Sequence, residues 1–196
     1  LAITPLVRAG LLDADTPLTI SAVSGYSGGG RQMIERYQAR TVSHPDALWY
    51  SRPYALSLQH KHVPEMQQYA GLTTAPLFLP SVGHYAQGML VSVPLSARWL
   101  RGAVSPDDLV AELARTYAEE PCVKVHNAND DSALEFGQLE PQANNGTNRV
   151  DLFVFGNADR MVLVARLDNL GKGAAGAAIQ NLNLMLALDE LRGLTV

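Results

Sequence analysis

Short runs of alternating apolar and polar residues recur along the chain and predict β-strands. The run Thr19–Val23 is typical, because it alternates and is rich in β-branched residues, which favours a half-buried strand. Turn-forming residues bound most of these runs. The pattern predicts six or seven strands, the others over residues 54–62, 77–80, 88–95, 123–125, 149–155 and 161–167.

Helical spacing of apolar residues marks the other elements. The clearest helix is expected over Pro106–Glu119, where Ser105 can act as the cap and Leu109, Leu113 and Tyr117 follow at fourfold spacing. Helices are also predicted over residues 1–12, from residue 31 onward, from 64 to about 69 and over 174–191, with a loop over 39–53. Because strands and helices do not alternate regularly, the sequence predicts an α+β fold with a mixed, largely antiparallel sheet flanked by helices.

Composition narrows the class of protein. The chain has 196 residues, 47% of them hydrophobic and 17% charged, which is typical of a globular domain. A net charge of −4 argues against nucleic-acid binding, and the apolar runs are too short to span a membrane. The single cysteine, Cys122, excludes a disulfide scaffold and a multi-thiolate metal site, and it fits a cytoplasmic location. The start at Leu1-Ala2-Ile3, without methionine, leads us to expect a piece of a longer protein.

The segment Ser24–Gly30 is the first candidate site. Four glycines and two serines lie between a predicted strand and a predicted helix. Backbone N–H groups at a helix start attract anions, and glycine allows a ligand to approach closely. The segment is not a Walker A loop, because Arg31-Gln32 follows where Lys-Ser/Thr is needed. We therefore expect anion or cofactor binding here, with a flexible turn as the alternative.

The segment His60–Glu65 is the second candidate. On the predicted strand, His60 and His62 point to the same face, and Glu65 lies in the first turn of the next helix. A carboxylate beside an imidazole favours its protonated form, as general acid–base catalysis requires. A zinc site and a solvated strand end remain the alternatives, and zinc is disfavoured because paired histidine ligands usually lie four residues apart on one helix.

Other motifs carry weaker signals. Gly171–Gly176 matches G-x-G-x-x-G, but no second strand with an acidic residue follows before Val196, so small residues for helix packing are the better interpretation. Acidic Glu119 and Glu120 beside Cys122 disfavour a thiolate, so Cys122 is interpreted as a small core residue. The serines also lack a G-x-S-x-G frame. The sequence thus offers a base and a phosphate cradle but no nucleophile.

Five segments in this order and spacing resemble the N-acetyl-gamma-glutamyl-phosphate reductase family of arginine biosynthesis, in its shorter bacterial type. They are residues 24–30, 60–65, 80–83, 145–149 and 167–174. The resemblance extends over essentially the whole chain, and it implies that an N-terminal NADP-binding Rossmann domain and the nucleophilic cysteine lie upstream of Leu1. It also implies a C-terminal domain like that of glyceraldehyde-3-phosphate dehydrogenase.

By this resemblance, residues 1–171 form a catalytic and dimerisation domain, and residues 172–196 form a helix that packs on the Rossmann domain. The family implies that His62 is the acid–base residue, that Glu65 steadies its imidazolium and that His60 lines the substrate pocket with Ser24. Ser27, Gly28 and Asn181 are expected beside the NADP cofactor. No metal is implied.

The implied activity is the NADPH-dependent reduction of N-acetyl-glutamyl 5-phosphate to the 5-semialdehyde through a cysteine thioester. The expected partners are a small-molecule substrate and further copies of the chain, as a homodimer or homotetramer, without nucleic acid or membrane. A related aspartate or aminoadipate semialdehyde dehydrogenase is one alternative. A phosphate- or nucleotide-binding module and a purely structural oligomerisation domain are the others.

Overall fold

A computed structural model describes residues 1–196, and its centre is one seven-stranded sheet with the order β2-β3-β1-β4-β7-β6-β5. The strands are β1 (Thr19–Gly25), β2 (Arg52–Pro53), β3 (Leu77–Gly83), β4 (Met89–Ser96), β5 (Val123–Val125), β6 (Val150–Gly156) and β7 (Arg160–Leu167). The pairs β1–β3 and β5–β6 are parallel, and all other neighbours are antiparallel. The predicted α+β fold with a mixed, largely antiparallel sheet is confirmed.

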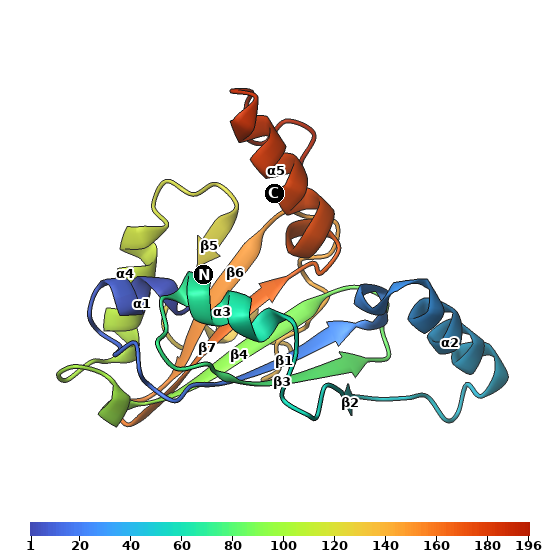
Figure 1. Cartoon of the computed structure of the whole chain (residues 1–196), viewed down its shortest axis with the longest axis horizontal. Coiled ribbons are helices and arrows are strands. Elements are labelled where there is room, and N and C mark those ends of the chain that lie inside the picture. Colours follow the sequence, from blue (N-terminus) through green and yellow to red (C-terminus); the bar gives the residue numbers. More distant parts are fainter.

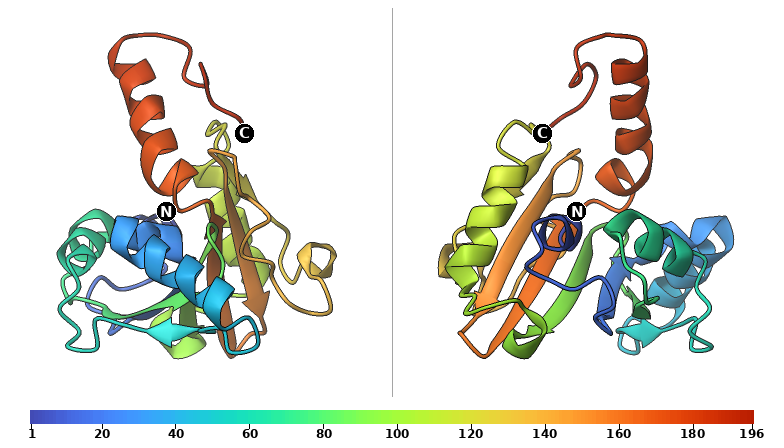
Figure 2. Two further views of the ribbon diagram at one scale, coloured as in Figure 1. Left: turned by 90° about the vertical axis from the view of Figure 1, so that its right-hand side faces the viewer. Right: turned by 60° about the vertical axis from the view of Figure 1, so that its left-hand side comes forward.

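Three helices lie in a row across one face of the sheet (Figures 1 and 2). The helices of the chain are α1 (Thr4–Arg8), α2 (Gly30–Ser43), α3 (His62–Ala70), α4 (Pro106–Thr116) and α5 (Gly176–Met185). The row consists of α4, α1 and α3, and α1 contacts both of the others. Helices α2 and α5 instead extend away from the sheet (Figure 1). No helix combines the length and the apolar character needed to cross a membrane.

The main core lies between this row of helices and the sheet. Leu6 of α1 and Leu109 and Leu113 of α4 are fully buried there with Leu152 of β6 and Leu163 of β7. Burial of each such side chain stabilises the fold by about 1.5–3 kcal/mol. Helix α4 begins as predicted, with the Ser105 hydroxyl accepting from the Asp108 N–H in a full capping box. The segment between β5 and β6 runs over the opposite face, where His126 stacks on Phe153.

The strand predicted over residues 54–62 is wrong. Residues 54–61 form a loop, and α3 begins at His62. Ala55 and Leu58 have positive φ angles of 52° and 59°, which no strand allows. The alternating apolar residues Leu56 and Leu58 are 69% and 43% exposed, so the alternation does not follow a buried face.

Three other boundaries differ from the prediction. Helix α2 continues through part of the predicted loop to Ser43, and in its last turn the Thr41 and Ser43 hydroxyls donate to carbonyl groups four residues earlier. The first helix covers only Thr4–Arg8. The C-terminal helix ends at Met185, beyond which the chain turns back and the Asn183 side chain donates to the carbonyl groups of two later residues.

Candidate functional site

The start of α3 brings His60 and His62 together. The His62 backbone N–H donates to His60 Nδ1 at 3.2 Å, and the two ring centroids are 4.8 Å apart. The pair is therefore formed by a helix start, and the predicted strand alternation is the wrong reason for it. Because Nδ1 accepts this bond, Nε2 carries the proton in neutral His60.

The two histidines have different surroundings. His60 is half-buried, with its ring edge-on to Phe78 at 5.2 Å and to Tyr54 at 5.7 Å, whereas His62 is exposed. Burial lowers the pKa of His60, the positive charges of His62 and Lys61 lower it further, and Glu65 acts in the opposite direction. His62 is thus the histidine that is open to a ligand, and His60 forms the wall behind it.

Glu65 lies in the first turn of α3, as predicted, but it forms no ion pair with His62. It lines an apolar cavity of about 410 Å³ between the sheet, α3 and the N-terminal residues. Lys172 is the other charged side chain in that lining. The influence of Glu65 on the histidine pair is therefore electrostatic, exerted through its charge on His60.

The two predicted serines lie in different places. Ser24 shares the sheet face of Ile20, and Ile20 pairs with Phe78, on which His60 packs. Ser24 is therefore on the same side of the sheet as α3. Ser27 lies beyond the end of β1, where its Oγ accepts from Asn169 Nδ2 at 3.0 Å.

The glycine-rich segment offers a smaller anion cradle than the sequence predicts. The N–H groups of Gly25, Tyr26 and Ser27 already donate to backbone carbonyls of the 85–88 segment. Gly28–Gly30 remain exposed, and α2 starts at Gly30 with no side-chain cap. The cradle is therefore reduced to Gly28–Gly30 and the uncapped start of α2.

Asp168 and Asn169 directly follow β7 and connect three of the resembling segments, residues 24–30, 145–149 and 167–174. Sequence reasoning did not identify this role. The Gly88 N–H donates to Asn169 Oδ1 at 2.9 Å, while the Asn169 amide holds Ser27. Asp168 accepts from the N–H groups of Gly146 at 2.9 Å and Leu170 at 2.8 Å. Burial raises the pKa of Asp168, but these N–H bonds outweigh that effect and hold it below its usual value. Their place inside the resembling segments was the only signal available.

Helix α5 turns two of its polar side chains inward. Gln180 and Asn183 are buried, and Gln180 Oε1 accepts from Asn148 Nδ2 at 3.0 Å. Lys172 Nζ donates to the same oxygen. Asn181, expected beside the cofactor, is exposed on this helix, and no hydrogen bond joins its side chain to the Ser27 segment.

Tight packing explains the G-x-G-x-x-G match. A Cβ on Gly171 would lie 2.5 Å from the Thr147 carbonyl oxygen, and one on Gly176 would lie 2.3 Å from Asn148 Oδ1. Gly171–Ala175 form a π-helical turn that leads into α5. Cys122 is buried beside Asn148 Nδ2, with its Sγ 3.5 Å away, which agrees with its interpretation as a core residue.

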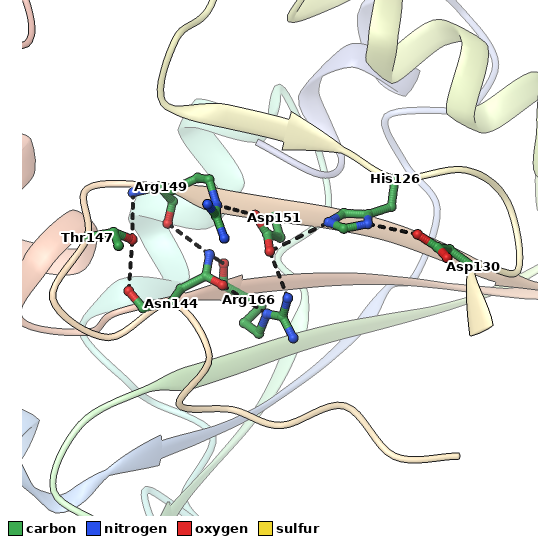
Figure 3. Close-up of polar contacts among 7 residues, drawn as sticks. All are labelled: His126, Asp130, Asn144, Thr147, Arg149, Asp151 and Arg166. Carbon is green, nitrogen blue, oxygen red and sulfur yellow. Dashed lines mark hydrogen bonds and ion pairs between the residues drawn. The ribbon is translucent and has the colours of Figure 1, made fainter. Parts of the chain in front are cut away.

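A buried charged cluster on the opposite face of the sheet was not predicted. Asp151 lies at its centre and accepts from Arg149 at 2.7 Å and from Arg166 at 2.8 Å, with His126 Nε2 at 3.5 Å (Figure 3). Burial raises the pKa of Asp151, but these three partners outweigh it and place the pKa far below its usual range. Arg149 is only two residues from Asp151 in the chain, but Arg166 reaches Asp151 through the pairing of β6 with β7, and His126 through that of β5 with β6. No local spacing pointed to this cluster.

Comparison with known proteins gives the family. Residues 1–169 match the family model described as "Semialdehyde dehydrogenase, dimerisation domain". The chain belongs to this family. The solved structures of aspartate semialdehyde dehydrogenase II from Vibrio cholerae (TM-score 0.68, 14% identity) and of a probable aspartate-semialdehyde dehydrogenase from Pseudomonas aeruginosa (TM-score 0.67, 19% identity) share the fold. These alignments cover 95% and 94% of this chain and 58% of each structure.

Two relatives of this semialdehyde dehydrogenase dimerisation domain are much more similar in sequence. N-acetyl-gamma-glutamyl-phosphate reductase 2 from Nostoc sp. is 46% identical over 98% of the chain, and the enzyme of the same name from Pseudomonas putida is 47% identical over 96%. The resemblance inferred from the five segments is confirmed. The chain spans 61% and 59% of the length of these two relatives.

Proposed function

We propose that this dimerisation domain is the part of an NADP-dependent N-acetyl-gamma-glutamyl-phosphate reductase that carries the acid–base residue and the substrate wall. One observation carries the proposal: the exposed His62 beside half-buried His60, in a chain 46–47% identical to proteins of that name. The full-length protein would act in the cytoplasm on a small acyl phosphate.

His62 is proposed as the acid–base residue, because its ring is exposed while His60 packs against aromatic side chains. It would accept the proton of a cysteine thiol supplied by the rest of the protein, as the thiolate displaces phosphate from the acyl phosphate. The imidazolium would then donate a hydrogen bond to the carbonyl oxygen of the bound acyl group during reduction. We propose that Glu65, in the same first turn of α3, steadies that imidazolium.

NADPH supplies the hydride when it is bound. The residues present fit an approach of the cofactor beyond the carboxyl end of β1, because Gly28–Gly30 are exposed and a Cβ at Gly30 would meet nothing within 4 Å. We propose that Ser27 and Gly28 lie beside the nicotinamide or a phosphate, and that Asn181 of α5 reaches the nicotinamide amide. His60 and Ser24 would line the substrate pocket on the α3 side of the sheet.

The division of the chain is part of the same proposal. Residues 1–171 would form the catalytic and dimerisation domain, and residues 172–196 would form a helix that packs on the Rossmann domain. The outward face of α5 supports this, because Ile179, Leu182 and Met185 are 41%, 52% and 82% exposed. Apolar side chains that gather on one helix face are typical of a contact surface. Association of copies into a homodimer or homotetramer is expected from the family description.

The test uses the full-length protein and the reverse reaction, in which N-acetyl-glutamate 5-semialdehyde, phosphate and NADP give NADPH. His62→Asn should lower kcat by about 100-fold or more, the usual effect of losing a general acid–base residue. Lys61→Ala, in the same turn, is the matched control and should keep kcat within about twofold. Equal turnover of aspartate semialdehyde, or an unaffected His62→Asn enzyme, would contradict the proposal.

A further inference from the structure

A second cleft lies beside the histidine pair, between α2 and the loop that leads to β2. It has a volume of about 440 Å³, and ten residues line it. They are Gly29, Gln32, Met33, Arg36, Tyr37, Trp49, Arg52, Pro53, Tyr54 and Val82. Two arginines and no acidic residue belong to this lining, so the cleft is positively charged.

The guanidinium groups of Arg36 and Arg52 have no carboxylate partner and no hydrogen bond within the chain. The Arg52 guanidinium carbon lies 4.7 Å from the centre of the Trp49 ring, and that of Arg40 lies 5.8 Å from it. Stacking on an indole fixes the plane of a guanidinium group while leaving its N–H donors free. Like charges gathered without a counter-charge destabilise the empty cleft, and a bound anion would remove that cost.

The aromatic wall is held in place by a chain of hydrogen bonds. The backbone N–H of Trp49 donates to His84 Nδ1 at 3.1 Å, and His84 Nε2 lies 2.8 Å from the Thr41 hydroxyl. Thr41 in turn donates to the Tyr37 carbonyl oxygen at 3.0 Å, so its oxygen accepts from the His84 ring. Tyr37 is buried against Trp49, with ring centroids 5.1 Å apart. The stacking surface for Arg52 is therefore preorganised.

Tyr54 connects this cleft to the histidine pair. It lines the cleft, and its ring lies 5.7 Å from that of His60, which contacts His62. Tyr54 is therefore a wall that the cleft shares with the histidine pair. The acyl phosphate of the proposed reaction carries its α-carboxylate at the end away from the reacting carbon.

We propose that the cleft is an oxyanion site in which Arg36 and Arg52 bind the α-carboxylate of the substrate. Planar guanidinium groups match a carboxylate through paired N–H···O bonds, and the amide of Gln32 adds a further donor. The identification of the carboxylate as the substrate's rests on the proposed function. The anion site itself does not depend on the rest of the full-length protein.

The experiment is calorimetric titration of the 196-residue chain at constant ionic strength with three separate probes. The probes are N-acetyl-L-glutamate, N-acetyl-L-glutamine and inorganic phosphate. N-acetyl-L-glutamine keeps the α-carboxylate and lacks the second charge, so we expect it to bind about as tightly as N-acetyl-L-glutamate. Binding of phosphate alone, or of no probe, would overturn the proposal.

Variants place the binding in the cleft. Arg36→Gln and Arg52→Gln should each weaken the binding of both amino-acid probes by about tenfold, the effect of losing a charge-assisted hydrogen bond. Arg31→Gln is the control with the same loss of charge, since Arg31 lies on α2 outside the cleft and pairs with Glu35. Equal weakening by Arg31→Gln would show that net charge alone governs binding, and would contradict the proposal.

The failure of this inference is distinguishable from failure of the proposed function. Binding that depends on Arg36 and Arg52, in a full-length protein without reductase activity, would support the proposed oxyanion site and contradict the proposed function. Reductase activity with a KM that Arg52→Gln leaves unchanged would support the proposed function and contradict the proposed site. Circular dichroism of both variants checks that the exposed substitutions leave the fold intact.

Discussion

Asn169 Nδ2 donates to Ser27 Oγ at 3.0 Å, although the two residues are 142 positions apart in the chain. The same amide group accepts from the Gly88 N–H at 2.9 Å through its Oδ1. One side chain thus fixes the end of β1 and the start of β4 relative to β7. Both its donor and its acceptor are used, so its orientation is determined by its partners.

Asn169→Ala should therefore loosen the glycine-rich segment. The Gly88 N–H would lose its acceptor in a partly buried place, which costs about 1–3 kcal/mol in the free energy of unfolding. Urea unfolding measures this loss, and faster amide exchange at Gly28–Gly30 would locate it. Gln38→Ala, on the exposed side of α2, is the control and should leave both quantities unchanged. Unaltered exchange at the glycines would contradict the role given to Asn169.

The charged cluster around Asp151 predicts a pH dependence of stability. The pKa of Asp151 is lower in the folded chain than in the unfolded chain. Its contribution is therefore fully present above the unfolded value of about 4, and it is lost as the pH falls toward the lower folded value. The pKa of Asp130 is lowered too, by hydrogen bonds from the Ser132 hydroxyl and from His126, and this adds to the loss.

Asp151→Asn tests this cluster directly. It leaves Arg166, whose side chain is only 8% exposed, without a charged partner, which costs about 3–5 kcal/mol at neutral pH. Urea unfolding at pH 7, 5 and 3 should show a smaller decrease with acid in the variant than in the unchanged chain. Asp107→Asn, outside the cluster on α4, is the control. A variant with an equally steep acid response would contradict the pH assignment.

The glycines of the G-x-G-x-x-G match should respond differently to alanine. Gly176→Ala places a Cβ 2.3 Å from Asn148 Oδ1 and should destabilise the chain by about 1–3 kcal/mol. Gly173→Ala has 3.3 Å to its nearest atom and should change stability little, because higher helix propensity offsets the tight contact. Thermal unfolding of the two variants separates these cases. Equal losses would show that backbone flexibility, and not Cβ space, is what the glycines provide.

The exposed apolar side of α5 predicts an effect that depends on the length of the protein. Leu182→Gln and Met185→Gln replace side chains that are 52% and 82% exposed, so the 196-residue chain should keep its stability within about 0.5 kcal/mol. In the full-length protein the same substitutions should lower the unfolding temperature, because they weaken packing on the Rossmann domain. Calorimetry of both proteins measures the difference. An unchanged full-length protein would contradict the proposed packing of residues 172–196.

Several local features could be predicted because their causes are local. The capping box of Ser105 and the apolar spacing of α4 are fixed by neighbouring residues, and the antiparallel pair β6–β7 follows from two alternating runs joined by a short turn. The loop that replaces the strand predicted over residues 54–62 shows the limit of this reasoning. Alternation gives a strand only where one face is buried, and burial depends on distant elements.

The sequence by itself determined the α+β class, the glycine-rich turn after β1, the helix start beside His62 and the family resemblance. The turn and the helix start depend on residues that are close together in the chain, whereas the fold class and the resemblance depend on the order of such local segments along it. The tertiary structure alone decided that Asn169 donates to Ser27, that Asp151 pairs with Arg166 and that Arg36 and Arg52 face one cleft. These contacts join residues from different elements, and spacing along a single sequence records neither the register of two strands nor which face of a helix meets a loop.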